Sequence, residues 1–361
     1  MKTHLLGSLL LSYIMLLAAC QPIRPNSDVT PAAPLTATEQ RNLAVVQKLY
    51  AGLGQGDSKV VLDLYAEQYT EHFSGQTGQM ARRQAADEQS VLRLSLPDLH
   101  TEIVSMFAQG DLVVTEMIWT ASLHGDFLGT PTTSPQSRHR GLIVRRLEAG
   151  KIVEEWDLFD NLSLLQSLGY LPAFEQIVAH GPSVAPTRPP APADAVFELN
   201  PANLTNQERW QQNLVKELYE AYANGNSEVI GETYAPHVQI HQAGQVKTTT
   251  AAQLQQEFAA AKQANPTLQP MVHSLAVHGE LVIVEMTWLG AHTGLYLGIP
   301  VTGRTIVRDG LIIYRLHNDK IAEVWEMWED LGFLQSVGYL SSWNNIVALG
   351  SSQDDRARAT K

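Results

Sequence analysis

Two acidic residues, Asp160 and Glu329, are the first candidates for chemistry in this sequence. Each ends a predicted strand, and alternation along that strand places it on the same face as a tryptophan, Trp156 or Trp325. A carboxyl group beside large apolar side chains is partly desolvated, which raises its pKa toward the range useful for general acid/base catalysis. The structural alternative is that Asp160 N-caps the helix predicted after it. That alternative is weaker for Glu329, because Asp330 is the better-placed cap.

Histidines form the second group of candidates. His72 and His241 each end an earlier predicted strand, where a pocket histidine would hydrogen-bond a substrate carbonyl or relay a proton. The alternative is a histidine bonded to neighbouring backbone. Arg146 and Arg315 recur on a later strand and are interpreted as exposed residues or structural ion pairs. The sequence has no phosphate-binding glycine motif or paired cysteine, so we expect neither a metal nor a cofactor.

These candidates come in pairs because most of the chain occurs twice. Residues 156–171 read WDLFDNLSLLQSLGYL and residues 325–340 read WEMWEDLGFLQSVGYL, which are identical at eight of sixteen positions. The offset, 325 − 156 = 169, also relates His72 to His241 and Gly141 to Gly310. One register over more than a hundred residues indicates two copies of a domain. Each copy, of about 140 residues, is long enough to hold its own core.

Each copy begins with helical periodicity and continues with strands. The predicted helices are 39–53, 82–94 and 162–168 in the first copy, and 206–222, 250–264 and 331–337 in the second. Period-two alternation with short turns predicts antiparallel hairpins over 101–123 and 140–159, and again at the same offset. This order of elements indicates an α+β fold, with helices on one face of a curved antiparallel sheet.

At this point the second copy shows a resemblance. Its runs ELVIVEMTWLGAHTGLYLGIPVTGR from Glu280 and RLHNDKIAEVWEMWEDLGFLQSVG from Arg315 resemble the SnoaL-like polyketide cyclase, or ester cyclase, family of the NTF2-like superfamily. The resemblance covers about 39–172 and 206–341. The first copy departs from it, with Leu123-His124-Gly125 where the second has His292-Thr293-Gly294.

The resemblance implies two tandem NTF2-like cones, each a curved sheet wrapped around N-terminal helices with an apolar small-molecule pocket. It implies cofactor-independent proton transfer by an acidic residue near Asp160, and it adds His292 as a candidate. Pairing of family members through the open sheet face implies that the two copies form an internal pseudo-dimer.

The chain ends and the connection between copies have their own signatures. Residues 1–19 are an apolar run of signal-peptide length, and Leu17-Ala18-Ala19-Cys20 is similar to a bacterial lipobox, in which the cysteine carries lipid. We therefore expect a lipid anchor at Cys20, an extracytoplasmic protein on a cell membrane and a flexible tether over 20–38. Several prolines interrupt residues 181–203, which we expect to link a first domain at 39–180 to a second at 204–350. Residues 351–361 form a polar tail in the sequence.

Charge narrows the classes of partner. The formal net charge is −12, and no lysine or arginine stripe occurs, which argues against a nucleic-acid partner. Two functions stay open: a cofactor-independent isomerase or cyclase, and a binding module that holds an apolar ligand or contacts other proteins without turnover.

Overall fold

The computed structural model describes residues 34–73, 76–122, 126–127, 130–131, 136–185, 198–199 and 204–348. Residues from Leu35 onward group into one compact unit. The expected signal peptide, Cys20 and the polar tail lie outside the described residues, as do most of the tether and the linker.

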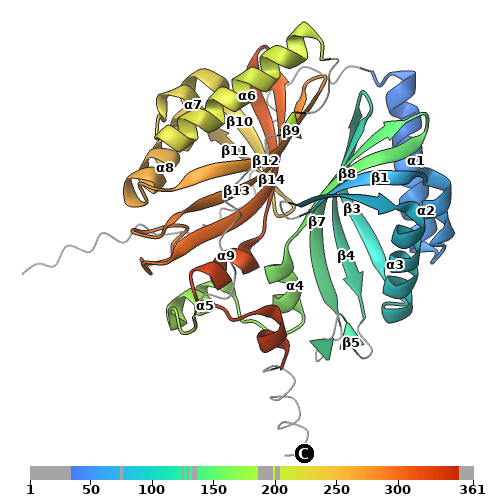
Figure 1. Ribbon diagram of the computed structural model, residues 1–361, viewed down its shortest axis with the longest axis horizontal. Coiled ribbons are helices and arrows are strands. Elements are labelled where there is room, and N and C mark those ends of the chain that lie inside the picture. The colour runs from blue at the N-terminus through green and yellow to red at the C-terminus, as the bar shows by residue number, and fades with distance from the viewer. Residues whose placement is uncertain are drawn as a thin grey trace, which may run out of the picture. The chain divides into compact units, whose positions relative to one another are not determined.

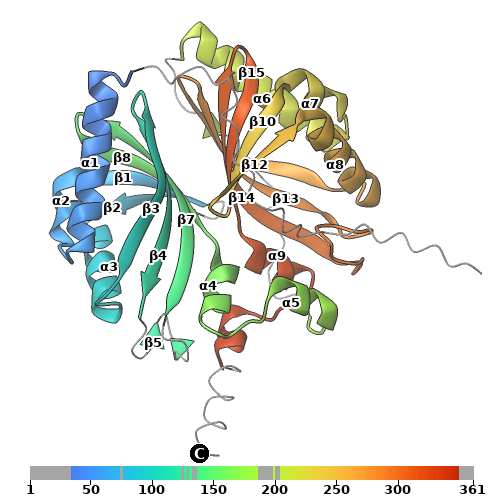
Figure 2. The same cartoon turned by 180° about the vertical axis from the view of Figure 1, so that it is seen from behind.

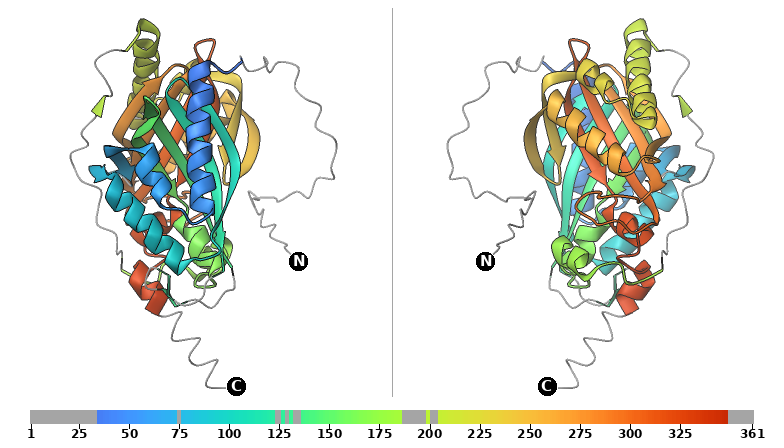
Figure 3. Two further views of the ribbon diagram at one scale, coloured as in Figure 1. Left: turned by 90° about the vertical axis from the view of Figure 1, so that its right-hand side faces the viewer. Right: turned by 90° about the vertical axis from the view of Figure 1, so that its left-hand side faces the viewer.

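The first repeat places its N-terminal helices along one face of a sheet (Figure 1). The sheet order is β2-β1-β8-β7-β4-β3, and Figure 3 shows α1 lying lengthwise against these strands. The elements are α1 (Ala37–Gly54), α2 (Lys59–Leu64), β1 (Tyr65–Phe73), β2 (Gln76–Ala81), α3 (Arg82–Ser95), β3 (His100–Gln109), β4 (Leu112–Ala121), β5 (Asp126–Phe127), β6 (Thr130–Pro131), β7 (Ser137–Glu148), β8 (Lys151–Phe159), α4 (Asn161–Ser167) and α5 (Phe174–His180).

The second repeat has the same arrangement, seen from behind in Figure 2. Its sheet order is β11-β10-β15-β14-β13-β12-β9, where β9 (Glu198–Leu199) is an added edge strand. The elements are α6 (Asn206–Asn224), α7 (Glu228–Thr233), β10 (Tyr234–Gln242), β11 (Gln245–Thr250), α8 (Ala251–Ala264), β12 (Gln269–His278), β13 (Leu281–Ala291), β14 (Thr305–His317), β15 (Lys320–Trp328) and α9 (Asp330–Ser336). The predicted helices and hairpins of both copies, and the tandem α+β fold, are confirmed.

Local sequence explains where the long helices begin. Thr36 and Glu39 form a reciprocal capping box at the start of α1, and Thr205 and Glu208 repeat it at α6. In both repeats the glutamate also accepts a hydrogen bond from the backbone of a hairpin turn, at Gly110 or at an equivalent glycine. The first helix of each repeat is thereby tied to the turn between the two strands that it crosses.

Each sheet contains a parallel pairing of two long strands, where only antiparallel pairing was expected. Strand β1 runs parallel to β8, and β10 runs parallel to β15. A β-bulge lies beside this pairing, since Arg146 pairs with Glu154 but Leu147 pairs with Ile152. One extra residue in a strand reverses the side-chain alternation beyond it. Two residues of β8 on either side of the bulge that simple alternation would place on one face of the sheet therefore lie on opposite faces.

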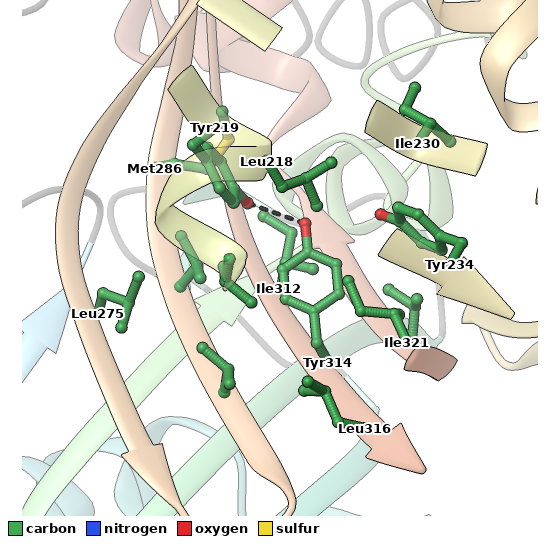
Figure 4. Close-up of a cluster of buried hydrophobic side chains, with 14 of the residues drawn as sticks. Leu218, Tyr219, Ile230, Tyr234, Leu275, Met286, Ile312, Tyr314, Leu316 and Ile321 are labelled. Atoms are coloured by element: carbon green, nitrogen blue, oxygen red, sulfur yellow. Dashed lines mark hydrogen bonds between the residues drawn. The ribbon is translucent and has the colours of Figure 1, made fainter. Parts of the chain in front are cut away.

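Each repeat has its own core between its helices and its sheet. The first contains Val46, Leu49 and Ile152, and the second contains Leu218, Ile312 and Ile321. Figure 4 shows the second core, where tyrosine rings pack among aliphatic side chains. These clusters agree with the expectation that each copy buries its own apolar face.

Two further clusters contain residues from both repeats. In one, strands of the two sheets contribute Leu112, Leu142, Trp156 and Leu158 from the first repeat and Ala276, Ile283, Ile313, Trp325 and Met327 from the second. The Trp156 indole donates a hydrogen bond to the Ser274 hydroxyl at 3.2 Å. In the other cluster, α4 and α5 pack against residues of the second repeat around α9. The outer sheet faces are therefore buried against each other.

No helix among the described residues is long and apolar enough to cross a membrane.

Candidate functional site

A cavity of about 210 Å³ lies inside the first repeat, between its helices and its sheet. Helices α1 and α3 form one wall, and strands β1, β4, β7 and β8 form the other. Its aromatic lining is Tyr50, Tyr65, Tyr69, Trp119 and Phe159, and its charged lining is Glu71, Glu88, Arg93, Arg145, Glu155 and Asp157. This lining differs from the apolar pocket that the resemblance implied, because charged groups make up much of its surface.

Arg145 is the centre of a buried network on one side of the cavity. Its Nε lies 2.5 Å from Glu155 Oε2, and both side chains are more than nine-tenths buried. Its Nη1 donates to the Tyr50 hydroxyl at 2.9 Å, and the Tyr65 hydroxyl donates to Glu155 at 2.8 Å. The guanidinium is thus held rigidly by one carboxylate and two phenols, which offsets much of the cost of burying its charge.

Three carboxyl groups gather beside this network. Oxygens of Glu71, Glu155 and Asp157 lie within 4.8 Å of one another. Burial raises the pKa of Asp157 well above its usual range, and the charges of Glu155 and Glu71 raise it further. Burial, Glu155 and Glu88 raise the pKa of Glu71. Among the described residues Asp157 Oδ1 is buried and has no hydrogen-bond partner, which disfavours the charged form of this carboxyl group.

The second repeat has other side chains at the equivalent positions. The 169-residue offset places Tyr314 at the position of Arg145, Val324 at that of Glu155 and Ile240 at that of Glu71. Tyr219 and Tyr314 hydroxyls lie 3.0 Å apart, as Figure 4 shows. A second pair, Tyr222 and Tyr234, has hydroxyls 3.2 Å apart. Glu326 stands at the position of Asp157, and burial raises its pKa although Arg308 opposes that effect.

The sequence-predicted acids have a structural role. Asp160 N-caps α4, with Oδ1 accepting a 3.0 Å hydrogen bond from the Ser163 amide. Glu329 N-caps α9 by accepting from the Gly332 amide at 2.5 Å. The expectation that Asp330 would be the better cap is wrong, because Asp330 Oδ1 instead forms an ion pair with Arg308 at 2.7 Å. Neither Asp160 nor Glu329 lines the cavity of the first repeat.

The paired histidines lie on the sheet face opposite the cavity. His72 stacks on Trp156 with ring centroids 4.7 Å apart, and its Nε2 lies 2.9 Å from Glu154 Oε1. His241 repeats both contacts, with Trp325 and with Glu323 at 2.7 Å.

The recurring arginines pair with the same two glutamates. Arg146 Nε lies 2.7 Å from Glu154, and Arg315 Nη1 lies 2.5 Å from Glu323. Since the identical arrangement occurs in both repeats beside the shared cluster, it serves the junction between the sheets.

His292 is isolated from these groups. It is fully buried in the segment between β13 and β14, where its Nδ1 lies 2.9 Å from the Thr302 hydroxyl and its amide donates to the Arg304 carbonyl. Burial lowers its pKa. These contacts hold that segment in place. The corresponding part of the first repeat, around His124, lies outside the described residues.

Sequence reasoning missed the cavity groups because it assigned the wrong face of β8. It placed Ile152, Trp156 and Asp160 on one face, but the bulge separates them. Ile152 enters the core of the first repeat, whereas Trp156 enters the cluster shared by both repeats. Glu155 and Asp157 share the face of Ile152 instead and line the cavity. A usable signal was present, since acids at 155 and 157 and an arginine at 145 are unusual on strands this apolar.

The family model that matches the chain agrees with the resemblance seen in the sequence. A family model described as SnoaL-like polyketide cyclase matches residues 44–168 and 212–337. No curated protein matches the sequence.

Three similar solved structures illustrate the likeness. AclR, a putative hydroxylase from Streptomyces galilaeus, is 22% identical; the match covers 37% of this chain and 99% of that one, with a TM-score of 0.34. IdmH, a putative polyketide cyclase from Streptomyces antibioticus, is 24% identical over 36% and 98%, with a TM-score of 0.33. A putative SnoaL-like polyketide cyclase from Jannaschia is 21% identical over 39% and 99%, with a TM-score of 0.35.

Proposed function

Because the chain belongs to the SnoaL-like polyketide cyclase family, we propose that its first repeat binds a small organic molecule and transfers a proton on it without a cofactor. The observation that carries this proposal is the Asp157 carboxyl, which lines the cavity and has a raised pKa and an oxygen without a partner. A carboxyl group in such surroundings gains and loses a proton near neutral pH more readily than an exposed one.

The network around Arg145 supplies the second part of this chemistry. The Tyr50 hydroxyl accepts a hydrogen bond from Arg145, so its own proton is available to a ligand oxygen in the cavity. If Asp157 removes a proton from carbon next to a carbonyl, negative charge develops on the carbonyl oxygen. A phenol polarised by a fixed guanidinium stabilises that charge where water is scarce. Isomerisation or cyclisation of a carbonyl compound therefore fits the arrangement.

The second repeat has a different role in this proposal. Its interior holds tyrosine pairs where the first repeat holds charged groups, and its sheet contributes half of the shared cluster. We propose that the two repeats form an internal pseudo-dimer in which the second supports the first. The alternative function is ligand binding without turnover, which differs from the enzyme only in whether the bound molecule exchanges protons.

Deuterium exchange tests the proton transfer. Small ketones and β-dicarbonyl compounds are incubated with the protein in D₂O, and loss of the α-proton signal is followed by NMR. Exchange by the wild type should fall about 10²–10⁴-fold in Asp157→Asn. Glu326→Gln changes the equivalent position of the second repeat and should leave the rate unchanged. Equal exchange by wild type and Asp157→Asn would refute the assignment, and molecules retained without any exchange would favour the binding module.

The location of the protein is a separate proposal. The apolar run over 1–19 and the single cysteine of the chain at Cys20 support a lipid-anchored, extracytoplasmic protein. Cys20→Ser should abolish metabolic labelling with fatty acid and release the protein from the membrane fraction. Unchanged labelling and fractionation of that variant would overturn it.

A further inference from the structure

The charges that line the cavity of the first repeat do not balance. Four carboxyl groups, at Glu71, Glu88, Glu155 and Asp157, face two arginines. Arg145 is already paired with Glu155, and Arg93 donates hydrogen bonds to the backbone carbonyls of Leu99 and Gly54. Within the described part of the chain, neither Glu71 nor Asp157 forms an ion pair. The described lining of the cavity therefore has two more carboxyl groups than cationic groups.

Two kinds of species would neutralise such a site. In the empty protein a proton does so, which agrees with the raised pKa values of both Asp157 and Glu71. In the complex a ligand with a positive charge would do so and would gain the attraction of both carboxylates. The aromatic rings of Tyr50, Tyr69 and Trp119 line the same space and favour an organic cation over a hydrated metal ion.

Resting on the function proposed above, we propose that the ligand of this cavity carries a positively charged nitrogen that lies against the carboxylates of Glu71 and Asp157. Both carboxyl groups line the cavity beside its aromatic rings, and their oxygens lie within 4.8 Å of each other. The cavity has about the volume of seven water molecules, so a small ammonium compound of about seven non-hydrogen atoms matches it. Its charge would hold Asp157 as a carboxylate, the form that removes a proton from the substrate.

Cation binding at this site is coupled to proton release. The charged and titratable groups that act on the carboxyl cluster are Glu155 on β8, Tyr65, Tyr69 and His72 on β1, Glu88 on α3, Arg145 on β7 and Glu285 on β13. Burial raises the pKa values of Tyr65 and Tyr69 further, so both phenols stay uncharged from weakly acidic to neutral pH. Affinity for the cation should consequently rise with pH, as the competing proton is lost.

A matched pair of probes tests the charge requirement in the full chain. Choline and 3,3-dimethylbutan-1-ol have the same shape and differ in the charge at one atom. By calorimetry or ligand-observed NMR, choline should bind about tenfold more tightly than the neutral alcohol, and the preference should grow from pH 6 to pH 8. Equal binding of the two probes, or a preference for the alcohol, would overturn the inference.

Variants locate the binding. Asp157→Asn and Glu71→Gln should each reduce choline affinity to that of the alcohol, and either variant suffices if the other fails to fold. Glu326→Gln, in the second repeat, should bind choline like the wild type. A choline preference unchanged by both cavity variants would overturn the site. Competition by millimolar Ca²⁺ or Mg²⁺, lost in the same variants, would show a metal site and overturn the organic cation.

This experiment separates the two proposals. If ketone exchange depends on Asp157 while choline and the alcohol bind alike, the cation inference fails and the proton-transfer function stands. If choline binds preferentially and no carbonyl compound exchanges, the proposed enzyme fails and the cavity is a binding site for organic cations.

Discussion

The interiors of the two repeats contrast sharply although their main helices and sheet strands occur in the same order. The first buries Arg145 and Glu155 and leaves a cavity, whereas the second places Tyr314 and Val324 at those positions. Buried ion pairs seldom add net stability over apolar groups of similar size. The first repeat therefore retains charges that stability alone does not require, and this difference assigns the chemistry to the first repeat and support to the second.

Separating the two repeats should change their stability and association more than any single substitution. Fragments 39–180 and 204–350 would each expose half of the cluster that contains Trp156 and Trp325. We expect the two fragments to associate when mixed, as measured by analytical ultracentrifugation. In urea, the second fragment should unfold at the higher concentration, because Tyr314 and Val324 stand where the first repeat buries Arg145 and Glu155. A higher urea midpoint for the first fragment would contradict the assignment of chemistry to the first repeat and of structural support to the second.

Glu155→Val gives the first repeat the residue of the second at one position only. It leaves the Arg145 guanidinium buried without its carboxylate, which should cost about 3–5 kcal/mol in the free energy of unfolding. The double variant Arg145→Tyr/Glu155→Val reproduces both residues of the second repeat and should recover most of that loss. Chemical denaturation measures both changes.

The control for this pair is Glu148→Val. Glu148 is an exposed partner of Arg146, and its loss should change stability by about 0.5 kcal/mol or less. A double variant no more stable than Glu155→Val would mean that the two interiors are not interchangeable at these positions.

Asp157→Asn should alter how stability depends on pH. The folded-state pKa of Asp157 is raised, so the native state binds more protons than the unfolded state between the unfolded and folded values. Its contribution to stability is present below the unfolded value and is lost as pH rises through the folded value. Asp157→Asn should flatten that fall and increase stability at neutral pH. Urea unfolding at several pH values tests this, and parallel profiles for variant and wild type would contradict it.

The helix caps should show the smallest effects, equal in the two repeats. Asp160→Ala and Glu329→Ala should each cost about 1 kcal/mol by thermal or chemical denaturation. Asp160→Asn should be nearly silent, since asparagine caps as well as aspartate. If Asp160→Asn instead abolished proton exchange while leaving stability unchanged, the acid predicted from the sequence would regain a catalytic role.

Sequence alone determined the parts of this protein that depend on local patterns. The constant 169-residue offset established two copies, helical periodicity located the helices, and short turns located the hairpins. Those signals are set by residues close together in the chain, so tertiary contacts seldom override them. The family followed from the same motifs.

Only the tertiary structure decided which face of each sheet meets the cavity. The extra residue in β8 between Ile152 and Glu154 reverses the alternation, and nothing local in the sequence marks that bulge. The parallel pairing of β1 with β8 then brings Glu71 to Glu155 and Asp157, across more than 80 residues of chain. The packing of the two sheets fixed the other face, where His72 and Trp156 meet the second repeat. Long-range pairing decided these placements, and local propensity does not encode it.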